Sequence, residues 1–284
     1  KIHKNMKKQK ICVIGDGLSG LTASLILGKL DIELHIIIRN DKQKKLNDPR
    51  TTAISPSNFN FLSNYLNSKD LKSFWACKNI NLFYEKLDQF NNFLNFYENG
   101  KNLLYIIQNN NLRKILLSKI KKNKNIKIIQ NEVKKVDTKN SGIILKNNKS
   151  RDYDFILLCL GRRSKIISDL VGKRYIQNDS KEVAFTSIVR HDSNIANAKQ
   201  YFLKEGPLAI LPINEKTFSF VWSVPDKYKN IESLVYSKFK KILGPKTNFF
   251  FKKSTNFPIS FKFNSNFSQN NSVVLGDGSY NVHP

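Results

Sequence analysis

The sequence has no long hydrophobic run. No apolar stretch among its 284 residues approaches the roughly 20 that a helix needs to cross a bilayer. The basic N-terminus does not resemble a secretory signal either, because the apolar run after it is short and leads directly into a glycine turn. With 40% hydrophobic and 25% charged residues, we expect a soluble chain with one large domain or two interleaved ones.

Cysteine and histidine are scarce. Cys12, Cys77 and Cys159 are scattered and form no C-x-x-C pair, and buried free thiols in strand-like runs are ordinary. A reducing cytoplasm is the natural interpretation. The four histidines show no zinc-ligand spacing, so we predict no metal site. We expect His191, which follows a strand-like run, to be structural or exposed rather than a catalytic base.

Acidic residues are few beside the basic ones. The chain has 48 Lys and Arg against 22 Asp and Glu, a formal net charge of +26. The lysines are spread along the whole chain together with abundant Asn and Ile, and all three residues have A/T-rich codons. Genomic base composition is therefore our first explanation. A docking face for an anionic membrane ranks second and nucleic-acid binding a distant third, so we expect no nucleic-acid partner.

Both ends of the sequence are unusual. The chain does not begin with Met, Met6 lies just before the first predicted strand, and the chain stops at His283-Pro284 within a predicted loop. We therefore expect a fragment of a longer protein.

The first ordered stretch contains a glycine turn. A buried strand is predicted over 11–14 and a helix over 18–30, and the spacing G-x-G-x-x-G joins them through Gly15, Gly17 and Gly20. In that context the first glycine permits a tight turn, the second lets a backbone approach a pyrophosphate, and the third lets the helix pack closely. The helix N-terminus then faces the phosphates. This pattern favours dinucleotide binding over a plain turn.

The residue that usually accompanies such a turn is missing. A dinucleotide site commonly has an acid about 20 positions further on, which binds a ribose hydroxyl. Here the second strand, over 32–38, is followed by Arg39 and Asn40, and Asp41 lies slightly late. Either Asp41 substitutes for that acid or the adenosine end is bound differently.

The rest of the chain divides into two patterns. The first half continues with helices over 57–66, with Ser57 as N-cap, and 112–120, an aromatic stretch over 75–97 that we assign mostly to sheet and core, and strands over 126–130, 142–146 and 153–160. The second half predicts antiparallel strands over 183–190, 200–202, 208–211 and 217–224, a helix over 231–243, and strands over 256–263 and 272–275. The predicted fold class is α/β (α+β overall): a Rossmann-like domain with an interleaved antiparallel β-sheet domain.

Four stretches occur in a fixed order: Gly15-x-Gly17-x-x-Gly20, Asp48-x-Arg50-x-x-Ala53-Ile54-Ser55, residues 206–213 with Val221-Trp222 downstream, and residues 276–284. Together they resemble the FAD-dependent aromatic hydroxylases, and most closely the ubiquinone-biosynthesis branch, which acts on polyprenylated phenols. The resemblance implies a discontinuous FAD-binding domain over 8–78, 101–180 and 266–284, and a substrate-binding domain over 79–100 and 181–265.

The resemblance also implies which residues contact the cofactor: Gly15, Gly17, Leu18, Ser19, Gly20, Arg50, Gln108, Gly161, Gly276, Asp277 and Pro284. Asp277 would accept hydrogen bonds from the ribitol hydroxyls, although an Asp in a Gly-Asp-Gly turn is common elsewhere. Arg50 would reach across the cofactor, and the alternative is a solvated loop arginine. Pro284 would fix the backbone beside the flavin ring. Gln108 lies in an Asn-rich run and has no preferred interpretation. Trp222 is expected in the core.

The implied activity is a monooxygenase in which reduced FAD activates O2 and an electron-rich phenol is hydroxylated, with NAD(P)H as electron donor. We assign no catalytic acid or base. Leu160 stands where the family usually has the Asp of an Asp-Gly pair, which puts reduction by NAD(P)H in doubt. Two alternatives remain: another FAD oxidoreductase of the same fold, and a degenerate non-catalytic subunit of a biosynthetic complex. The expected location is the cytoplasm, with a peripheral contact at the inner membrane face as an extension.

Overall fold

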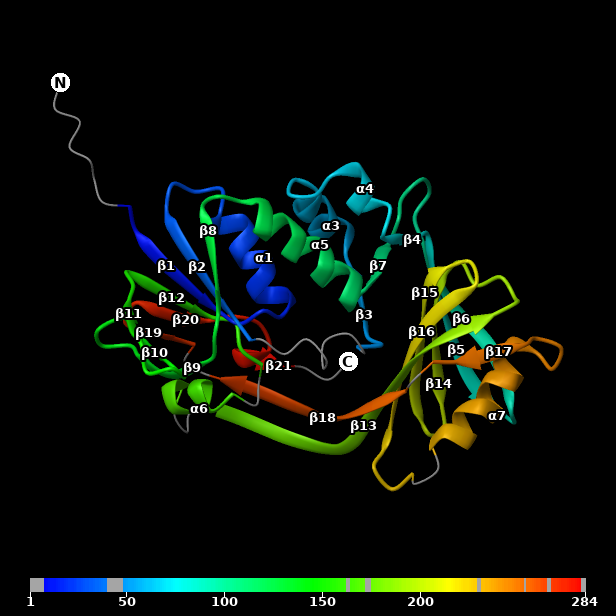
Figure 1. Cartoon of the computed structure of the whole chain (residues 1–284). Helices are drawn as coiled ribbons and strands as arrows, with labels where there is room; N and C mark the ends of the chain where they lie inside the picture. Colours follow the sequence, from blue (N-terminus) through cyan, green and yellow to red (C-terminus); the bar gives the residue numbers. More distant parts are fainter. Residues whose placement is uncertain are drawn as a thin grey trace. The chain divides into compact units, whose positions relative to one another are not determined.

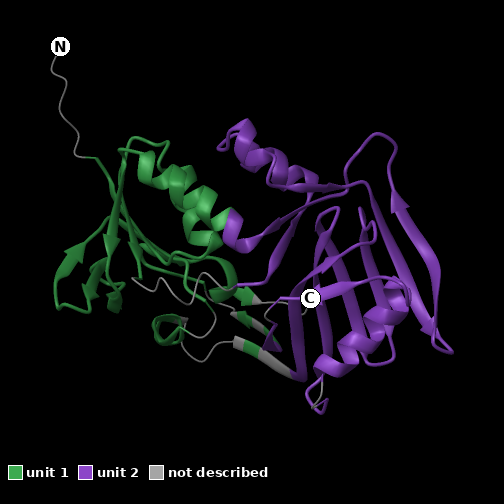
Figure 2. Cartoon of the chain, turned by 45° about the vertical axis from the view of Figure 1, so that its right-hand side comes forward, with its two compact units in different colours: residues 1–43, 112–178, 260–284 green, residues 44–111, 179–259 purple. Residues whose placement is uncertain are grey.

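The structure is a computed structural model and describes residues 8–39, 48–161, 164–171, 175–228, 231–252, 254–264 and 267–281. The chain forms two compact units (Figure 2). Unit 1 contains residues 1–43, 112–178 and 260–284, and unit 2 contains residues 44–111 and 179–259. Each unit is therefore assembled from segments that are far apart in the sequence.

Unit 1 is built on a six-stranded sheet in which neighbouring strands are parallel except at one edge. Its spatial order is β19 (Ser268–Gln269), β20 (Ser272–Val274), β12 (Phe155–Leu158), β1 (Lys10–Ile14), β2 (Glu33–Ile38) and β8 (Ile126–Gln130). β1 and β12 are central and largely buried, as expected for continuous apolar runs in a parallel sheet.

Helix α1 (Leu18–Leu27) follows β1 and packs against β1 and β2 (Figure 1). It buries Leu21 and Leu25 and ends before the expected 18–30 does, with its C-cap at Gly28. Unit 1 also includes most of α5 (Asn109–Lys122), α6 (Lys165–Val171), a small antiparallel sheet and a final turn: β9 (Val133–Asp137), β10 (Gly142–Leu145), β11 (Ser150–Asp152), η1 (Gly276–Gly278) and β21 (Tyr280–Asn281).

Unit 2 is built on a larger sheet that is antiparallel except between β14 and β5. Its order is β21, β18 (Thr255–Asn264), β13 (Tyr175–His191), β16 (Thr217–Pro225), β15 (Gly206–Asn214), β14 (Ala198–Leu203), β5 (Asn79–Lys86) and β6 (Gln89–Tyr97), with β17 (Phe249–Phe251) paired to β13. The adjacent strands β13 and β18 each extend across a unit boundary in the sequence.

The core of unit 2 lies between this sheet and helix α7 (Ile231–Leu243), which has the predicted bounds. Val235 and Phe239 on α7 pack with Phe218, Phe220 and Trp222 of β16, and these side chains are almost fully buried. Trp222 is therefore a core residue, as expected.

A second, three-stranded sheet in unit 2 consists of β3 (Thr51–Ile54), β7 (Leu104–Gln108) and β4 (Trp75–Cys77). Helices α3 (Pro56–Ser63) and α4 (Ser68–Leu71) lie between β3 and β4 in the sequence. The N-cap predicted at Ser57 is wrong. Ser55 caps α3 by accepting a hydrogen bond from Asn58 N, and Pro56 occupies the first turn, where its missing N–H costs no helical hydrogen bond.

The unit boundaries differ from the expected division at several places, and residues 260–264, expected in the second domain, belong to unit 1. Residues 48–78 and 101–111, expected in the first domain, belong to unit 2, because β4 and β7 pack on β15 and share a small core that includes Cys77 and Ile106.

The aromatic stretch over 75–97 forms strands as predicted, but much of it is not core. Phe93, Phe96 and Tyr97 of β6 are 50%, 47% and 70% exposed. The prediction was wrong for these residues because β6 is the last strand of its sheet, so fewer neighbours cover its side chains.

Candidate functional site

The glycine turn after β1 has the geometry that its spacing predicts. Gly15 has a φ of +117°, and a Cβ there would overlap the carbonyl oxygen of Cys159, the residue after β12. A Cβ at Gly20 would overlap the carbonyl oxygen of Gly15. Both glycines are therefore required by the chain's own close packing, as expected for the first and third positions of the motif.

Gly17 differs from these two glycines. Its φ of −69° is accessible to any residue, it is exposed, and no described atom lies within 4 Å of a Cβ built on it. As the N-cap of α1 it provides no side-chain hydrogen bond, and the first turn, which includes Leu18 and Ser19, contains no acidic residue. The open space and the uncapped helix end together leave room for an anionic group.

The far end of the chain meets this turn within unit 1. β20 runs parallel to β12, and η1 follows it. Gly276 has a φ of +75°, and a Cβ there would lie 2.6 Å from the Ser19 hydroxyl oxygen. The adjacent Asp277 is exposed and has no hydrogen bond or ion pair to any other described residue. Segments about 260 positions apart in sequence therefore adjoin at the carboxyl ends of parallel strands, where ligands bind in such sheets.

The loop after β12 is open as well. Gly161 is exposed, and an added Cβ would meet no described atom within 4 Å. Leu160, just before it, is half-buried and packs against the core of unit 1. The structure thus gives Leu160 a packing role in place of an exposed acid. Asp41, His283 and Pro284 lie outside the described residues.

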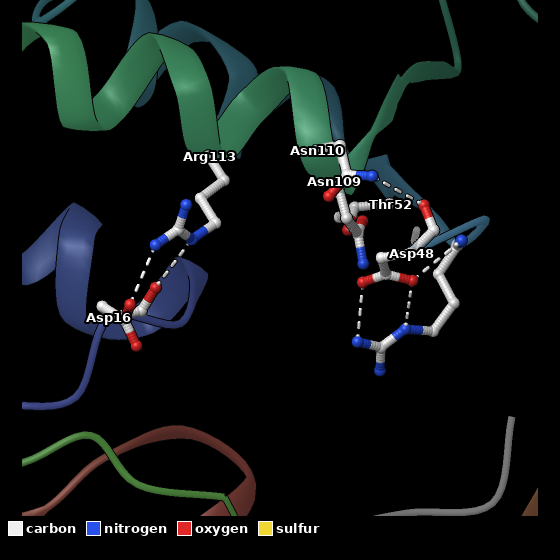
Figure 3. Close-up of polar contacts among 7 residues, drawn as sticks. Asp16, Asp48, Thr52, Asn109, Asn110 and Arg113 are labelled. Atoms are coloured by element: carbon white, nitrogen blue, oxygen red, sulfur yellow. Dashed lines mark hydrogen bonds and ion pairs between the residues drawn. The ribbon is translucent and has the colours of Figure 1, made fainter. Parts of the chain in front are cut away.

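A charged pair at the turn was missed by the sequence analysis. Asp16, the residue between the first two glycines, is 8% exposed, and its Oδ2 lies 2.8 Å from Nη2 of Arg113 on α5 (Figure 3). Arg113 also donates from Nε to the Asp16 carbonyl oxygen at 3.3 Å. Burial lowers the pKa of Arg113, which nevertheless stays cationic near neutrality. Arg113 thereby neutralises the Asp16 carboxylate beside the N-terminus of α1. The only feature of the sequence that points to this ion pair is the presence of an acid within the glycine motif.

Unit 2 holds its own polar cluster around Arg50. Asp48 binds the guanidinium of Arg50 in a bidentate manner, with oxygen–nitrogen distances of 2.8 and 2.7 Å (Figure 3). Asn110 donates to the Asp48 carbonyl oxygen at 3.1 Å, and Thr52 donates to Asn109 at 2.7 Å. Burial alone would raise the pKa of Asp48, but the hydrogen bonds and charge of Arg50 outweigh it and the pKa is lowered.

Strand pairing brings two of the predicted contacts together in this cluster. Gln108 on β7 lies opposite Thr51, the residue next to Arg50. The Arg50 side chain is about half exposed in spite of its ion pair. Arg50 and Gln108 were expected from the sequence, whereas the ion pair of Asp48 with Arg50 was not.

The remaining titratable candidates are structural. His191 is buried, its Nδ1 lies 3.0 Å from the Ser193 hydroxyl, and burial lowers its pKa, in agreement with the expected role. Burial raises the pKa of Cys12 and Cys159 to about 12 and that of Cys77 to about 11, so these thiols are unreactive near neutrality. Within the described ranges, no three His, Cys, Asp or Glu side chains are grouped as metal ligands, and no helix is long and apolar enough to span a membrane.

The elements define the class of fold. A parallel sheet with a glycine turn after its first strand, interleaved in sequence with a mainly antiparallel sheet, is the predicted Rossmann-like arrangement. No model of a known protein family matches the sequence, and no curated protein sequence matches it.

Solved structures share this fold at low sequence identity. p-Nitrophenol 4-monooxygenase PnpA from Pseudomonas putida is 15% identical, with a TM-score of 0.80 over 98% of this chain and 75% of that one. PqsL from Pseudomonas aeruginosa, described as a probable FAD-dependent monooxygenase, is 12% identical with a TM-score of 0.79 over 97% and 80%. A mutant of 2-methyl-3-hydroxypyridine-5-carboxylic acid oxygenase is 15% identical with a TM-score of 0.78 over 96% and 76%.

Proposed function

We propose that this chain binds FAD and takes part in the hydroxylation of an aromatic ring by O2. The observation that carries the proposal is the junction in unit 1 between the open Gly17 turn and the Gly276–Asp277 turn. The fold shared with aromatic-ring monooxygenases supports the same interpretation.

The residues of unit 1 fit the cofactor. The first-turn N–H groups of α1 and the open surface at Gly17 suit a pyrophosphate, because they offer donors, a positive dipole end and no obstructing side chain. The exposed carboxylate of Asp277 suits sugar-alcohol hydroxyls, which donate hydrogen bonds. Arg113 removes the repulsion that Asp16 would otherwise exert on a phosphate.

When bound, FAD supplies the oxygen chemistry, and the chain supplies orientation and exclusion of water. In unit 2, we assign Arg50 and Gln108 to cofactor contact. Asp48 binds the Arg50 guanidinium through both carboxylate oxygens, which limits the rotamers of Arg50. We assign Gly161 to the same cofactor surface, since its exposed backbone has no neighbour within 4 Å of the Cβ position.

For the substrate, we propose a polyprenylated phenol of ubiquinone biosynthesis, with NAD(P)H as electron donor. The sequence resemblance in the stretches around Arg50 and over 206–213 supports this assignment. We place the protein in the cytoplasm, with peripheral contact at the inner membrane face, which the net charge of +26 favours.

A second candidate is a non-catalytic subunit of a biosynthetic complex that retains the fold. Two observations favour it: half-buried Leu160 packs against the core where the family usually has an acid, and Asp48 already neutralises Arg50. Such a subunit would not turn over a phenol.

The experiment that separates the two candidates is an absorption spectrum of the purified full-length protein, followed by mass analysis of the released cofactor. The enzyme hypothesis expects FAD, phenol-dependent NAD(P)H oxidation and a hydroxylated product. FAD without product from any polyprenylphenol contradicts the substrate assignment, and absence of flavin supports the subunit hypothesis.

A further inference from the structure

A neutral aromatic patch lies at the edge of the main sheet of unit 2. Five side chains from β5, β6 and β14 are between 40% and 50% exposed, and we call them the β6 patch: Tyr84, Phe93, Leu94, Phe96 and Phe202. The Phe93 ring centroid lies 5.9 Å from that of Tyr84 and 5.9 Å from that of Phe202. β6 contains no charged residue, although a quarter of the chain is charged. A contiguous exposed apolar patch is typical of a binding surface.

The β6 patch lies on the sheet face opposite α7. Phe83 and Tyr201 stack on each other and belong to the core that α7 closes. Successive strand residues point to opposite faces, so Tyr84 and Phe202 point away from α7. Register places further residues on that same face: Leu94 opposite Leu82, and Phe96 opposite Ile80.

The side chains on this face become smaller from the sheet edge toward its centre. Paired residues form a row across six strands, from β6 to β13: Leu94, Leu82, Gln200, Ala209, Val221 and Thr186. With strands about 4.8 Å apart, this row is about 24 Å long. A second row beside it runs from Tyr84 on β5 through Phe202 on β14 to Pro207 on β15, whose side chain is again smaller. In these rows the bulkiest apolar side chains therefore lie at the sheet edge.

We propose that the β6 patch binds the isoprenoid tail of the aromatic substrate, with the ring of that substrate over Ala209 and Val221. This inference rests on the proposed function and names the subsite for the tail. An isoprenoid chain is long, neutral and without hydrogen-bonding groups, so it gains most from an apolar surface on which no charge must be desolvated. β6 provides nine consecutive uncharged residues for it.

Two other occupants fit less well. A face for anionic lipid would be expected to carry several basic side chains among the apolar ones, and β6, which contributes three of the five side chains, has none. A second copy of a chain with net charge +26 would be opposed by repulsion between like charges.

The test uses the full-length protein and equilibrium dialysis with radiolabelled 2-farnesylphenol and, separately, 2-methylphenol. The variant Leu94→Ser/Phe96→Ser should bind 2-farnesylphenol at least about tenfold more weakly, and Phe93→Ser should show a smaller loss in the same direction. Affinity for 2-methylphenol should not change. The matched control is Tyr97→Ser, which removes a 70% exposed aromatic residue of the same strand, paired opposite Asn79 on the α7 face, and should leave both affinities unchanged.

Equal affinity of variant and wild type for 2-farnesylphenol overturns the proposal. So does a loss that appears only in sedimentation of anionic vesicles, which would assign the patch to a membrane, or only in the oligomeric state, which would assign it to a second copy. Hydroxylation of 2-methylphenol by the same FAD-loaded preparations is measured in parallel. If no product forms while the tail effect persists, the proposed reaction fails and the tail subsite stands. If product forms without a tail effect, the reaction stands and the subsite fails.

Discussion

At the residue scale, Gly15 and Gly17 provide a matched pair that separates folding from ligand binding. Gly17→Val adds a side chain where the structure has open space, so the apoprotein should still fold, with a loss of about 1 kcal/mol because Val is a poorer N-cap than Gly. The same side chain would occupy the approach to the helix N-terminus, and the affinity for FAD should fall at least about tenfold, or 1.4 kcal/mol. Flavin fluorescence titration measures it.

Gly15→Ala should act differently. The positive φ of Gly15 and the nearby Cys159 carbonyl oxygen leave no room for a Cβ. The free energy of unfolding of the Gly15→Ala apoprotein should therefore fall, whether or not FAD is present. If Gly17→Val binds FAD as the wild type does, the cofactor does not approach the chain at this turn.

A second prediction at this scale concerns His35, which is buried in unit 1 between Tyr153 and Glu33. Burial lowers the pKa of His35 below its usual value, with Glu33 opposing the shift. The unfolded chain therefore binds a proton at higher pH than the folded chain does. Stability should fall as pH decreases through about 6.5, the unfolded pKa. Urea unfolding between pH 7.5 and 5.5 measures this fall.

The matching variant is His35→Gln, whose stability should change less over the same interval. Some slope will remain, because burial also lowers the pKa of His191. Parallel curves for the two proteins would exclude His35 as a source of the pH dependence. The carboxylates do not interfere, since their unfolded pKa values lie near 4.

The residues that could be predicted from sequence are those whose role follows from local backbone geometry. Gly15 and Gly20 were identifiable because a strand-turn-helix pattern fixes where a Cβ cannot fit. The Arg113 partner of Asp16 was not, because 97 positions separate them and only the packing of α5 brings them together. Asp277 could be assigned to the turn only through the resemblance of its neighbours to a known family.

At the element scale, α7 is joined to the sheet by a buried ion network. Lys238 on α7 contacts carboxylates of Glu85 on β5 and Glu205 after β14, and all three side chains are 4–5% exposed. Burial alone would raise the pKa of Glu85, but the hydrogen bond and charge of Lys238 outweigh it. Burial would lower the pKa of Lys238, and the two carboxylates reverse that effect. Lys238 therefore stays charged because both partners are present.

Lys238→Met should reduce the free energy of unfolding by about 3–5 kcal/mol, because it leaves two carboxylates buried without a cation. The combined variant with Glu85→Gln and Glu205→Gln should recover part of this loss. Lys241→Met is the control on the same helix: its ion pair with Asp88 is exposed, so stability should hardly change. If Lys238→Met and Lys241→Met reduced the free energy of unfolding equally, the buried ion network would not be what stabilises the packing of α7 on the sheet.

The elements themselves were predictable where apolar periodicity is complete. α7 has its expected bounds because apolar residues recur at helical spacing along it, at Ile231, Leu234, Val235, Phe239 and Ile242. β13 begins at Tyr175, eight positions before the expected start at Val183. The polar run before Val183 has no apolar alternation, so the sequence does not predict a strand there. Pairing with neighbouring strands extends β13 through this run. The exposed face of β6 was not predictable, since sequence does not reveal which strand ends a sheet.

At the scale of the whole molecule, unit 1 contains both ends of the described chain, so a ligand bound by unit 1 can contact residues from both. Unit 1 is assembled from three sequence segments, and the first and last of them contribute Gly17 and Asp277. This arrangement was anticipated because the motifs that resemble the family lie near the two termini. The division at the unit boundaries was not, because the packing of β4 and β7 on β15 is a long-range contact.

This arrangement predicts how FAD stabilises the protein. A ligand at about 100 times its Kd adds about 2.7 kcal/mol to the unfolding free energy. For a chain of this size that raises Tm by about 5–10 °C. Differential scanning fluorimetry with FAD should show this shift in the unfolding transition, whereas riboflavin, which lacks the phosphates, should produce little. Asp277→Ala should leave the Tm of the apoprotein unchanged, because the Asp277 side chain is exposed, and should reduce the FAD-induced shift by at least about half. A full shift in that variant would mean that FAD binds without the C-terminal turn, and the junction of the two turns would then be a packing feature of the fold alone.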